Sequence, residues 1–273
     1  MPATSLLRHI EACHTARLPG SRLALRIGGV TVGWIQPADA ALLEGVRREP
    51  GAVELETAAR LTELAETLAA RGRFRPRGEA FDVRAAPGGP VLARIDRGAL
   101  PLFGIAAEGV HVNGVVRRRS GLHLWVARRA ADKALDPGKL DHLVAGGIPA
   151  GLTPAETLVK EAAEEAGIPA TLAAQARAVG HIAYTMERPE GLRRDRLHLF
   201  DLELPDDFTP VPMDGEVAGF ELWPLARVIA AMRETDDFKF NVNLVLIDLA
   251  LRLGAIDPAG REGRALRAAL DAG

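Results

Sequence analysis

The chain has 273 residues, of which 48% are hydrophobic and 26% are charged, and its formal net charge is −2. These values are typical of a soluble globular protein with one large or two modest domains, and they give no overall basic field to attract nucleic acid or an anionic membrane. We find no membrane-length apolar run and no secretory signal, and the single cysteine, Cys13, excludes an internal disulfide and a cysteine zinc cluster, so we expect a cytoplasmic protein with a packed thiol.

The first half of the chain mixes helical and strand-like patterns, which predicts a small α+β domain. The expected elements are a short helix in 5–14, a hairpin in 23–35, a helix in 56–72 that ends at Gly72, and a strand in 80–86. We place the domain boundary between residues 105 and 118. Residues 1–110 would then form the N-terminal domain and residues 111–273 the second domain.

The second half begins with two strand-like runs, 109–119 and 122–130, which a Ser-Gly pair joins into a hairpin. A long loop over 131–151 and a helix over Thr153–Ala166 follow. The remaining expected elements are a short helix around 170–178, strands in 180–186, 196–204 and 217–223, and helices in 224–233, 242–254 and 260–271.

The helix over residues 153–166 has a well-defined predicted start. Thr153 fits the N-cap, Pro154 fits the first helical position, and Glu156 falls where the acid of a capping box belongs. This structural role is sufficient to explain Glu156. We therefore interpret Glu156 as a helix cap and not as a metal ligand.

Three further acids, Glu161, Glu164 and Glu165, lie in the last turns of this helix, in line with Thr157 on one narrow face. A helix C-terminus carries partial negative charge, and like charges four residues apart repel, so this placement is unfavourable unless a cation binds. We expect the acids to point away from the core and to hold Mg²⁺ or Mn²⁺; the alternative is a solvated helix face. The opposite face, which we expect to pack on a sheet, consists of Ala155, Val159, Ala162, Ala163 and Ala166.

Gly146 and Gly147 precede the helix, where they would allow a substrate to approach the backbone closely. From Gly146 onward the sequence resembles the Nudix box, which reads G, five residues, E, seven residues, R-E-U-x-E-E-x-G-U, with U a bulky apolar residue. The chain keeps the first glycine, the three acids, the later glycine and the final apolar residue. It departs by Lys160 in place of Arg, by an alanine at the first U position, and by Leu152 in place of the first Glu, which supports the metal site in Nudix enzymes.

The resemblance extends over nearly the whole chain, most specifically over residues 103–255. It points to a Nudix subfamily that has an N-terminal domain of unknown function and has been called thiamine pyrophosphokinase-related. This resemblance implies an α/β protein with a Nudix α/β/α sandwich and a smaller α+β N-terminal domain. It also implies hydrolysis of a small-molecule diphosphate, notably oxo- or oxythiamine diphosphate, to the monophosphate and phosphate, with Mg²⁺ or Mn²⁺ as cofactor.

The same resemblance implies roles for individual residues. Glu161, Glu164 and Glu165 would hold the metal, Lys160 would orient Glu161, and Glu216 would help with metal or water. One of these acids would be the general base, and the sequence does not select among them. The alternative for Glu216 is an ordinary residue of a surface turn.

Three other side chains are candidates for substrate binding. Arg193 and Arg194 could clamp a diphosphate by charge-assisted hydrogen bonds, or they could lie in a solvated loop. Tyr184, the only tyrosine, could stack on a heteroaromatic ring, but we favour packing in the core. His142 is expected to be a hydrogen-bonded structural residue, because no pair of histidines has the spacing of metal ligands.

Two alternative functions remain at this level. One is the same chemistry on ADP-ribose, NADH or coenzyme A. The other is a Nudix fold that binds a nucleotide or partner without catalysis, which Leu152 favours. A thiamine kinase is rejected because the sequence contains no G-x-x-x-x-G-K-[ST] loop. The sequence does not specify the oligomeric state.

Overall fold

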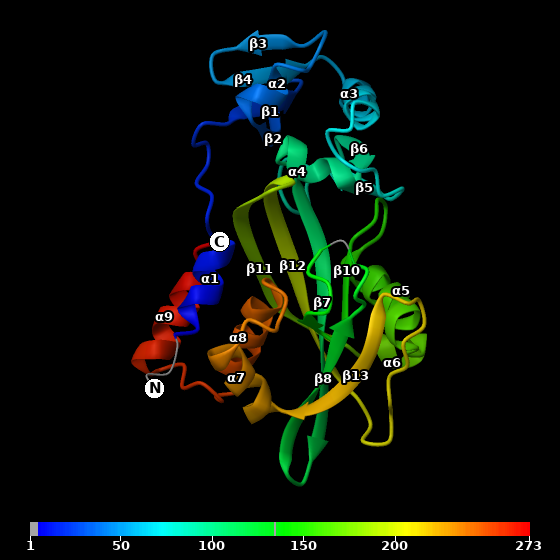
Figure 1. Cartoon of the computed structure of the whole chain (residues 1–273), viewed down its shortest axis with the longest axis vertical. Coiled ribbons are helices and arrows are strands. Elements are labelled where there is room, and N and C mark those ends of the chain that lie inside the picture. Colours follow the sequence, from blue (N-terminus) through cyan, green and yellow to red (C-terminus); the bar gives the residue numbers. More distant parts are fainter. Residues whose placement is uncertain (1–4, 134) are drawn as a thin grey trace.

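The structure is a computed structural model that describes residues 5–133 and 135–273 (Figure 1). Ala134, which belongs to the predicted loop over 131–151, and residues 1–4 lie outside the described residues. Within the described part of the chain, none of the helices combines the length and the apolar character needed to cross a membrane.

The N-terminal half folds as a small sheet with one long helix, followed by a separate short hairpin. The four-stranded sheet has the order β2-β1-β4-β3, in which β1 and β2 are antiparallel and β1 and β4 are parallel. The predicted hairpin and the predicted helix ending near Gly72 are confirmed. The elements are α1 (Leu7–Cys13), β1 (Leu23–Ile27), β2 (Val30–Ile35), α2 (Pro37–Ala40), β3 (Arg47–Glu49), β4 (Ala52–Leu55), α3 (Ala58–Ala70), β5 (Ala80–Val83), β6 (Ala93–Asp96), the 3-10 turn η1 (Arg97–Ala99) and α4 (Leu100–Phe103).

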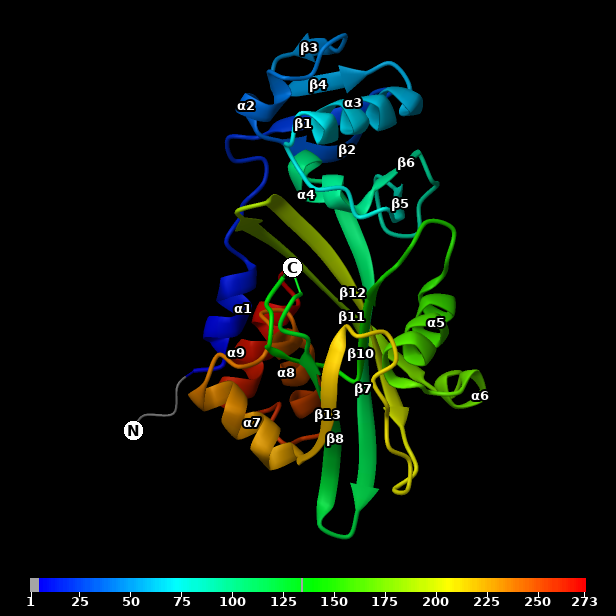
Figure 2. The same ribbon diagram turned by 45° about the vertical axis from the view of Figure 1, so that its right-hand side comes forward.

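The second half is built on a larger mixed sheet with the order β11-β12-β7-β8-β13, to which β10 adds beside β7 and β9 beside β8. Helices α5 and α6 cover one face of this sheet, and α7, α8 and α9 cover the other (Figures 1 and 2). The α/β/α sandwich is therefore confirmed. Its elements are β7 (Ala106–Arg118), β8 (Gly121–Arg129), β9 (Leu140–Asp141), β10 (Val144–Gly147), α5 (Pro154–Ala166), α6 (Ala170–Ala173), β11 (Arg177–Arg188), β12 (Gly191–Glu203), β13 (Val217–Pro224), α7 (Leu225–Glu234), α8 (Val242–Arg252) and α9 (Arg261–Leu270).

Two predictions about local structure were wrong. The segment 131–151 is not only a loop, because it contains β9 and β10. Strands β7 and β8 pair near their hairpin and then separate, and β10 pairs with β7 while β9 pairs with β8 in the space between them. The helix expected over 170–178 is one turn, α6, because strand β11 already pairs with β12 from Arg177 onward.

The N-terminal helix α1 packs into the core of the second half. Leu6, Ile10 and Cys13 are buried together with residues of α8, α9 and the main sheet, and Figure 1 shows α1 beside α9. A separate hydrophobic core contains residues between Leu25 and Ile105. Part of the predicted N-terminal domain therefore belongs structurally to the sandwich, while the boundary near residue 110 stays a prediction.

We expect Cys13 to be unreactive in the native protein. Its side chain is fully buried, and burial raises the pKa of the thiol to about 12. Because the thiolate is the reactive form, a maleimide or disulfide reagent at pH 8 should not modify the folded chain within minutes. Labelling followed by mass spectrometry checks this, with the denatured protein as the control that reacts fully. Rapid stoichiometric labelling of the native protein would contradict the packing of α1.

Candidate active site

Helix α5 is fixed at both ends by hydrogen bonds that the sequence encodes. At its start, the Thr153 hydroxyl accepts from the Glu156 N–H at 3.2 Å, and the Glu156 carboxylate accepts from the Thr153 N–H at 2.9 Å. At its end, Gly167 adopts a φ of 62°, and the N–H of Ile168 donates to the carbonyl of Ala162 at 3.0 Å. The predicted capping box is confirmed, and these two ends fix the direction in which the acids project.

The prediction that the acids point away from the core is wrong for Glu161 and Glu165 and is confirmed only for Glu164, which is exposed. Glu165 is buried and Glu161 is partly buried, whereas Ala155 and Ala163 of the expected packing face are exposed. The reason lies in strand β10, where a Cβ on Gly146 would come within 2.6 Å of Glu161 Oε2. Because glycine has no side chain, the acidic side of the helix packs directly against this strand.

Lys160 lies beside two of the acids. Its Nζ is 3.0 Å from Glu161 Oε1 and 2.6 Å from Glu164 Oε2. Burial would lower the pKa of Lys160, but the hydrogen bonds with Glu164 and Glu161 raise it. Burial raises the pKa of Glu161, and the charges of Glu164 and Glu79 add to this rise against the opposing effect of Lys160. The lysine therefore offsets only part of the crowding of negative charge.

Glu165 is the buried member of the three. Its Oε2 accepts a hydrogen bond from the Ala145 N–H on β10 at 2.9 Å. Burial raises the pKa of Glu165 well above its ordinary range, and the charges of Asp141, Glu161 and Asp214 add to the rise. A buried carboxylate among other acids holds a proton unless a cation lies close to it. Glu165 is therefore the acid whose ionisation depends most on a bound cation.

Glu216 lies at the same place in the fold as Glu165, although the two are far apart in the sequence. The Glu216 carboxylate forms an ion pair with Lys133. Burial would raise the pKa of Glu216, but Lys133, together with the charges of Arg97 and Arg129, lowers it. Both acids border one narrow pocket, whose lining residues are Ala127, Arg129, Asp141, His142, Ala145, Glu165, Glu216 and Val217.

The donors on this side of α5 fit a hard divalent cation. Glu161, Glu164 and Glu165 offer carboxylate oxygens, which Mg²⁺ and Mn²⁺ prefer, and the raised pKa values of Glu161 and Glu165 reflect negative charge that a cation would balance. Within the described residues, the ligand atoms of the three acids do not all lie within 4.8 Å of one another. Lys160 pairs with two of them instead.

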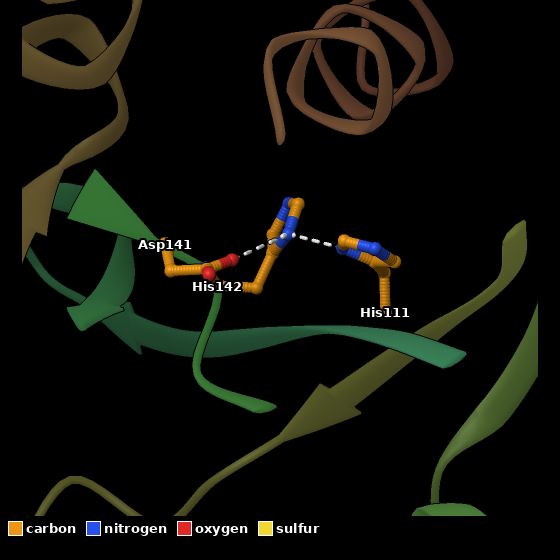
Figure 3. Close-up of side chains that lie close together, drawn as sticks. All are labelled: His111, Asp141 and His142. Atoms are coloured by element: carbon orange, nitrogen blue, oxygen red, sulfur yellow. Dashed lines mark hydrogen bonds and ion pairs between the residues drawn. The ribbon is translucent and has the colours of Figure 1, made fainter. Parts of the chain in front are cut away.

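A second group of ligand-type residues lies near the separation of β7 and β8. His111 Nδ1 and His142 Nδ1 are 2.9 Å apart, and Figure 3 shows His142 between His111 and Asp141. Burial lowers the pKa of both histidines, that of His142 to about 4, so both rings are neutral. One Nδ1 then carries the hydrogen and donates it to the other Nδ1. Asp141 Oδ2 already pairs with Arg129 at 2.8 Å and with Lys239 at 3.6 Å.

This group fits a divalent cation poorly, because two positively charged side chains surround its only carboxylate. His142 is hydrogen-bonded as expected, and its role as a structural residue instead of a metal ligand stays a prediction. Sequence reasoning did not find its partner His111, because the contact joins β7 to the segment after β9 and leaves no short spacing to recognise.

Residues of the N-terminal half also reach this region, and sequence reasoning missed them. A Cβ on Gly147 would lie 2.5 Å from Phe81 Cζ and 3.3 Å from Arg97 Cζ. The Ala150 N–H donates to the Ala80 carbonyl at 2.8 Å. Both glycines therefore make room for side chains of this chain, and their predicted role in substrate binding stays a prediction. The sequence separation of these contacts left no local signal.

Arg193, Arg194 and Tyr184 are not brought together with the acids of α5. Tyr184 is 1% exposed and hydrogen-bonds to Asp195 in the core between the sheet and α8, so it has no free ring face for a substrate. The interpretation of Tyr184 as a core residue is confirmed. Arg193 Nε donates to the same Asp195 at 3.1 Å, and Arg194 donates to the Gly104 carbonyl at 3.2 Å. The two arginines thus bond within the protein, and neither lies in a solvated loop.

Comparison with known proteins gives matches over this half of the chain. The NUDIX domain family matches residues 108–243. Nudix hydrolase 20, chloroplastic, and Nudix hydrolase 24, chloroplastic, both from Arabidopsis thaliana, are 44% and 45% identical to the chain over 182 residues. That region is 67% of this chain and 49% and 50% of the relatives, so the chain spans about half the length of the curated relatives it matches. The crystal structure of DR0079 from Deinococcus radiodurans aligns with 62% of this chain and 97% of its own, at 22% identity and a TM-score of 0.48.

We expect Mg²⁺ or Mn²⁺ to stabilise the folded chain through the acids of α5. At a concentration ten times the Kd, preferential binding to the folded state adds about 1.4 kcal/mol, which raises the Tm by about 3 °C in a protein of this size. Thermal unfolding with and without metal measures the shift. The shift should disappear in the triple variant Glu161→Gln/Glu164→Gln/Glu165→Gln, and an undiminished shift there would place the cation elsewhere.

We expect Glu156→Gln to leave turnover near that of the wild type in saturating metal. Glutamine keeps the hydrogen bond of the capping box, and the Glu156 carboxylate is occupied by Thr153. Glu164→Gln, a matched change on the same helix, should reduce kcat by about 100-fold or more, as losses of charge-stabilising groups do. Equal losses in the two variants would show that Glu156 has taken the place of the carboxylate missing at Leu152.

Proposed function

The chain belongs to the Nudix family through residues 108–243, and we propose that it hydrolyses an organic diphosphate with the help of Mg²⁺ or Mn²⁺. The observation that supports this most is the placement of Glu161, Glu164 and Glu165 on a doubly capped helix, beside a pocket that Glu216 also lines. Helix α5 carries all three acids, and strand β10 contacts Glu161 and Glu165. The acids therefore supply oxygen ligands for a cation that binds phosphate, once Lys160 no longer pairs with Glu161 and Glu164.

In this proposal the three acids share one task, and their neighbours hold them in place. Glu161, Glu164 and Glu165 would hold the cation, which neutralises phosphate charge and lowers the pKa of a bound water. Lys160 keeps Glu161 and Glu164 in place from the outer side of the helix. Glu165, through its hydrogen bond from Ala145, ties the ligand set to β10.

Glu216 is the acid that we place as general base. Lys133, Arg97 and Arg129 outweigh burial and lower its pKa. The carboxylate is therefore ionised at neutral pH, as a proton acceptor must be, although the lowered pKa makes it a weak base. It would take a proton from the water that attacks phosphorus. The bridging P–O bond then breaks, and the products are a monophosphate and inorganic phosphate. Positioning and charge stabilisation supply most of the rate in such reactions.

The substrate that we propose is a thiamine-type diphosphate, in particular oxo- or oxythiamine diphosphate. The carboxylates of α5 recognise phosphate through the cation and do not read the group beyond it, so specificity must come from other parts of the chain. The choice of thiamine rests on the resemblance to the subfamily described above, over residues 103–255, and is an argument by analogy. ADP-ribose, NADH and coenzyme A are the competing substrates for the same chemistry.

One observation favours a second function, in which the fold binds a nucleotide or a partner without catalysis. Leu152 stands where the box has its first glutamate, and it is partly buried in the turn before α5, where its N–H donates to the Pro149 carbonyl at 3.1 Å. The position therefore offers no carboxylate to a cation. The three acids that remain support the catalytic proposal over this one.

We expect oxo- or oxythiamine diphosphate to be hydrolysed with a higher kcat/KM than ADP-ribose, NADH or coenzyme A. A site that hydrogen-bonds the oxo group of an altered thiamine diphosphate discriminates against the analogue that has an amino group there by as much as about 10⁴-fold. Phosphate release and product identification in Mg²⁺, with all substrates in parallel and Glu164→Gln as the inactive control, measure this preference.

Three outcomes separate the alternatives. A clear preference for ADP-ribose or NADH would replace the proposed substrate and keep the chemistry. Hydrolysis that Glu164→Gln leaves intact would remove α5 from the mechanism. Binding of these diphosphates without any turnover would support the non-catalytic function instead.

A further inference from the structure

The hairpin β5–β6 and the turn η1 of the N-terminal half lie directly against the loop that enters α5. Figure 2 shows this loop rising from β10 toward β5 before it returns to the helix. The contact is specific: the Ala150 N–H donates to the Ala80 carbonyl at 2.8 Å, and the Gly151 N–H donates to Asp82 Oδ2 at 3.2 Å. The N-terminal half therefore forms one wall of the region around the acids.

Arg97 is the charged residue that this wall presents. Its guanidinium lies 5.5 Å from the centre of the Phe81 ring and 3.3 Å from the position that a Cβ on Gly147 would take. The neighbouring glycine, Gly146, gives its space to the Glu161 carboxylate. Arg97 and Glu161 thus lie against consecutive residues of β10, and therefore on opposite faces of the strand. Gly147, which Arg97 contacts, shares its face with Ala145, one of the residues that line the pocket of Glu165 and Glu216.

The other cations around the acids are already occupied. Lys160 pairs with Glu161 and Glu164, and Lys133 pairs with Glu216. Arg129 bonds to Asp141 and to two backbone carbonyls, with 13% of its side chain exposed.

Arg97 is also paired, but it is the most exposed of these four cations. Within the described residues its side chain has one carboxylate partner, Glu79 at 2.9 Å, and 48% of the side chain is exposed. Its charge also reaches the site. Burial raises the pKa of Glu216 and Lys133 lowers it, and the charge of Arg97 lowers it further.

We propose that Arg97, supplied by the N-terminal half, binds a phosphate group of the diphosphate substrate. An arginine can donate two parallel hydrogen bonds to one phosphate, a geometry that lysine does not reproduce. The guanidinium lies over the ring of Phe81, and Glu79 is the carboxylate partner that a phosphate would replace. The inference rests on the proposed hydrolase function for its kinetic effects, but it also predicts binding of a diphosphate without turnover.

The test compares four variants of the full chain by kinetics and by calorimetric binding of methylenediphosphonate in Mg²⁺. Arg97→Gln should raise KM, lower kcat/KM by about 10- to 100-fold and weaken binding to a similar extent, because a charge-assisted pair is lost. Arg97→Lys should fall between this variant and the wild type. Arg71→Gln is the matched control, since Arg71 is also in the N-terminal half, is 45% exposed and has one carboxylate partner.

Glu79→Gln separates substrate binding from docking of the hairpin. If Arg97 serves only to hold the hairpin, then loss of its partner should reproduce the effect of Arg97→Gln. If Arg97 binds phosphate, Glu79→Gln should bind methylenediphosphonate at least as tightly as the wild type. All four variants should have Tm values close to that of the wild type, because the exposed ion pairs contribute little to stability.

The outcomes distinguish this inference from the proposed function. Hydrolysis by the wild type with unchanged kinetics and binding in Arg97→Gln overturns the role of Arg97 and leaves the function intact. Weakened methylenediphosphonate binding in Arg97→Gln, with no hydrolysis by the wild type, supports Arg97 and overturns the function. Failure of the wild type both to bind and to hydrolyse overturns both.

Discussion

Strand β10 and helix α5 approach so closely that position 146 has no room for a side chain, and the candidate site depends on this contact. The approach places Glu161 against the strand and allows Glu165 to accept a hydrogen bond from the Ala145 backbone. Removal from water raises the pKa of both acids. The strand thus removes part of the water from these carboxylates. A cation bound there is attracted more strongly than it would be by the same carboxylates in open solvent.

The repulsion among the acids destabilises the helix only slightly. A like-charge pair one turn apart costs a helix about 0.2–0.5 kcal/mol, whereas an N-cap such as that formed by Thr153 contributes about 1 kcal/mol. Lys160 also offsets part of the repulsion. The helix can therefore form with its acids unliganded, and the larger cost lies in the burial of Glu165. That cost belongs to the site and not to the helix.

The space between β7 and β8 explains why β10 is held firmly enough to define the site. β9 and β10 fill this space, and the buried Asp141 of β9 is paired with Arg129 and Lys239. Breaking such a buried pair typically costs about 3–5 kcal/mol, because the remaining charge has no partner. On the outer side, the hairpin β5–β6 covers the loop that follows β10, and α1 closes the opposite face of the sandwich. Both halves of the chain thus support the strand and the helix of the candidate site.

The sequence by itself determined the parts of the protein that depend on neighbours in the chain. The capping box of α5, the glycine that ends it and the paired strands β7 and β8 follow from residue order, because capping and hairpin formation act over a few residues. The Nudix box placed the three acids on that helix for the same reason. Tertiary structure decided which side of the helix was buried, because Gly146 leaves room on the strand for the Glu161 carboxylate. It also decided that Glu216, His111, Phe81 and Arg97 lie beside the helix or its supporting strands. These contacts join segments far apart in the chain, and no spacing in the sequence encodes them, since their geometry exists only once the sheet has formed.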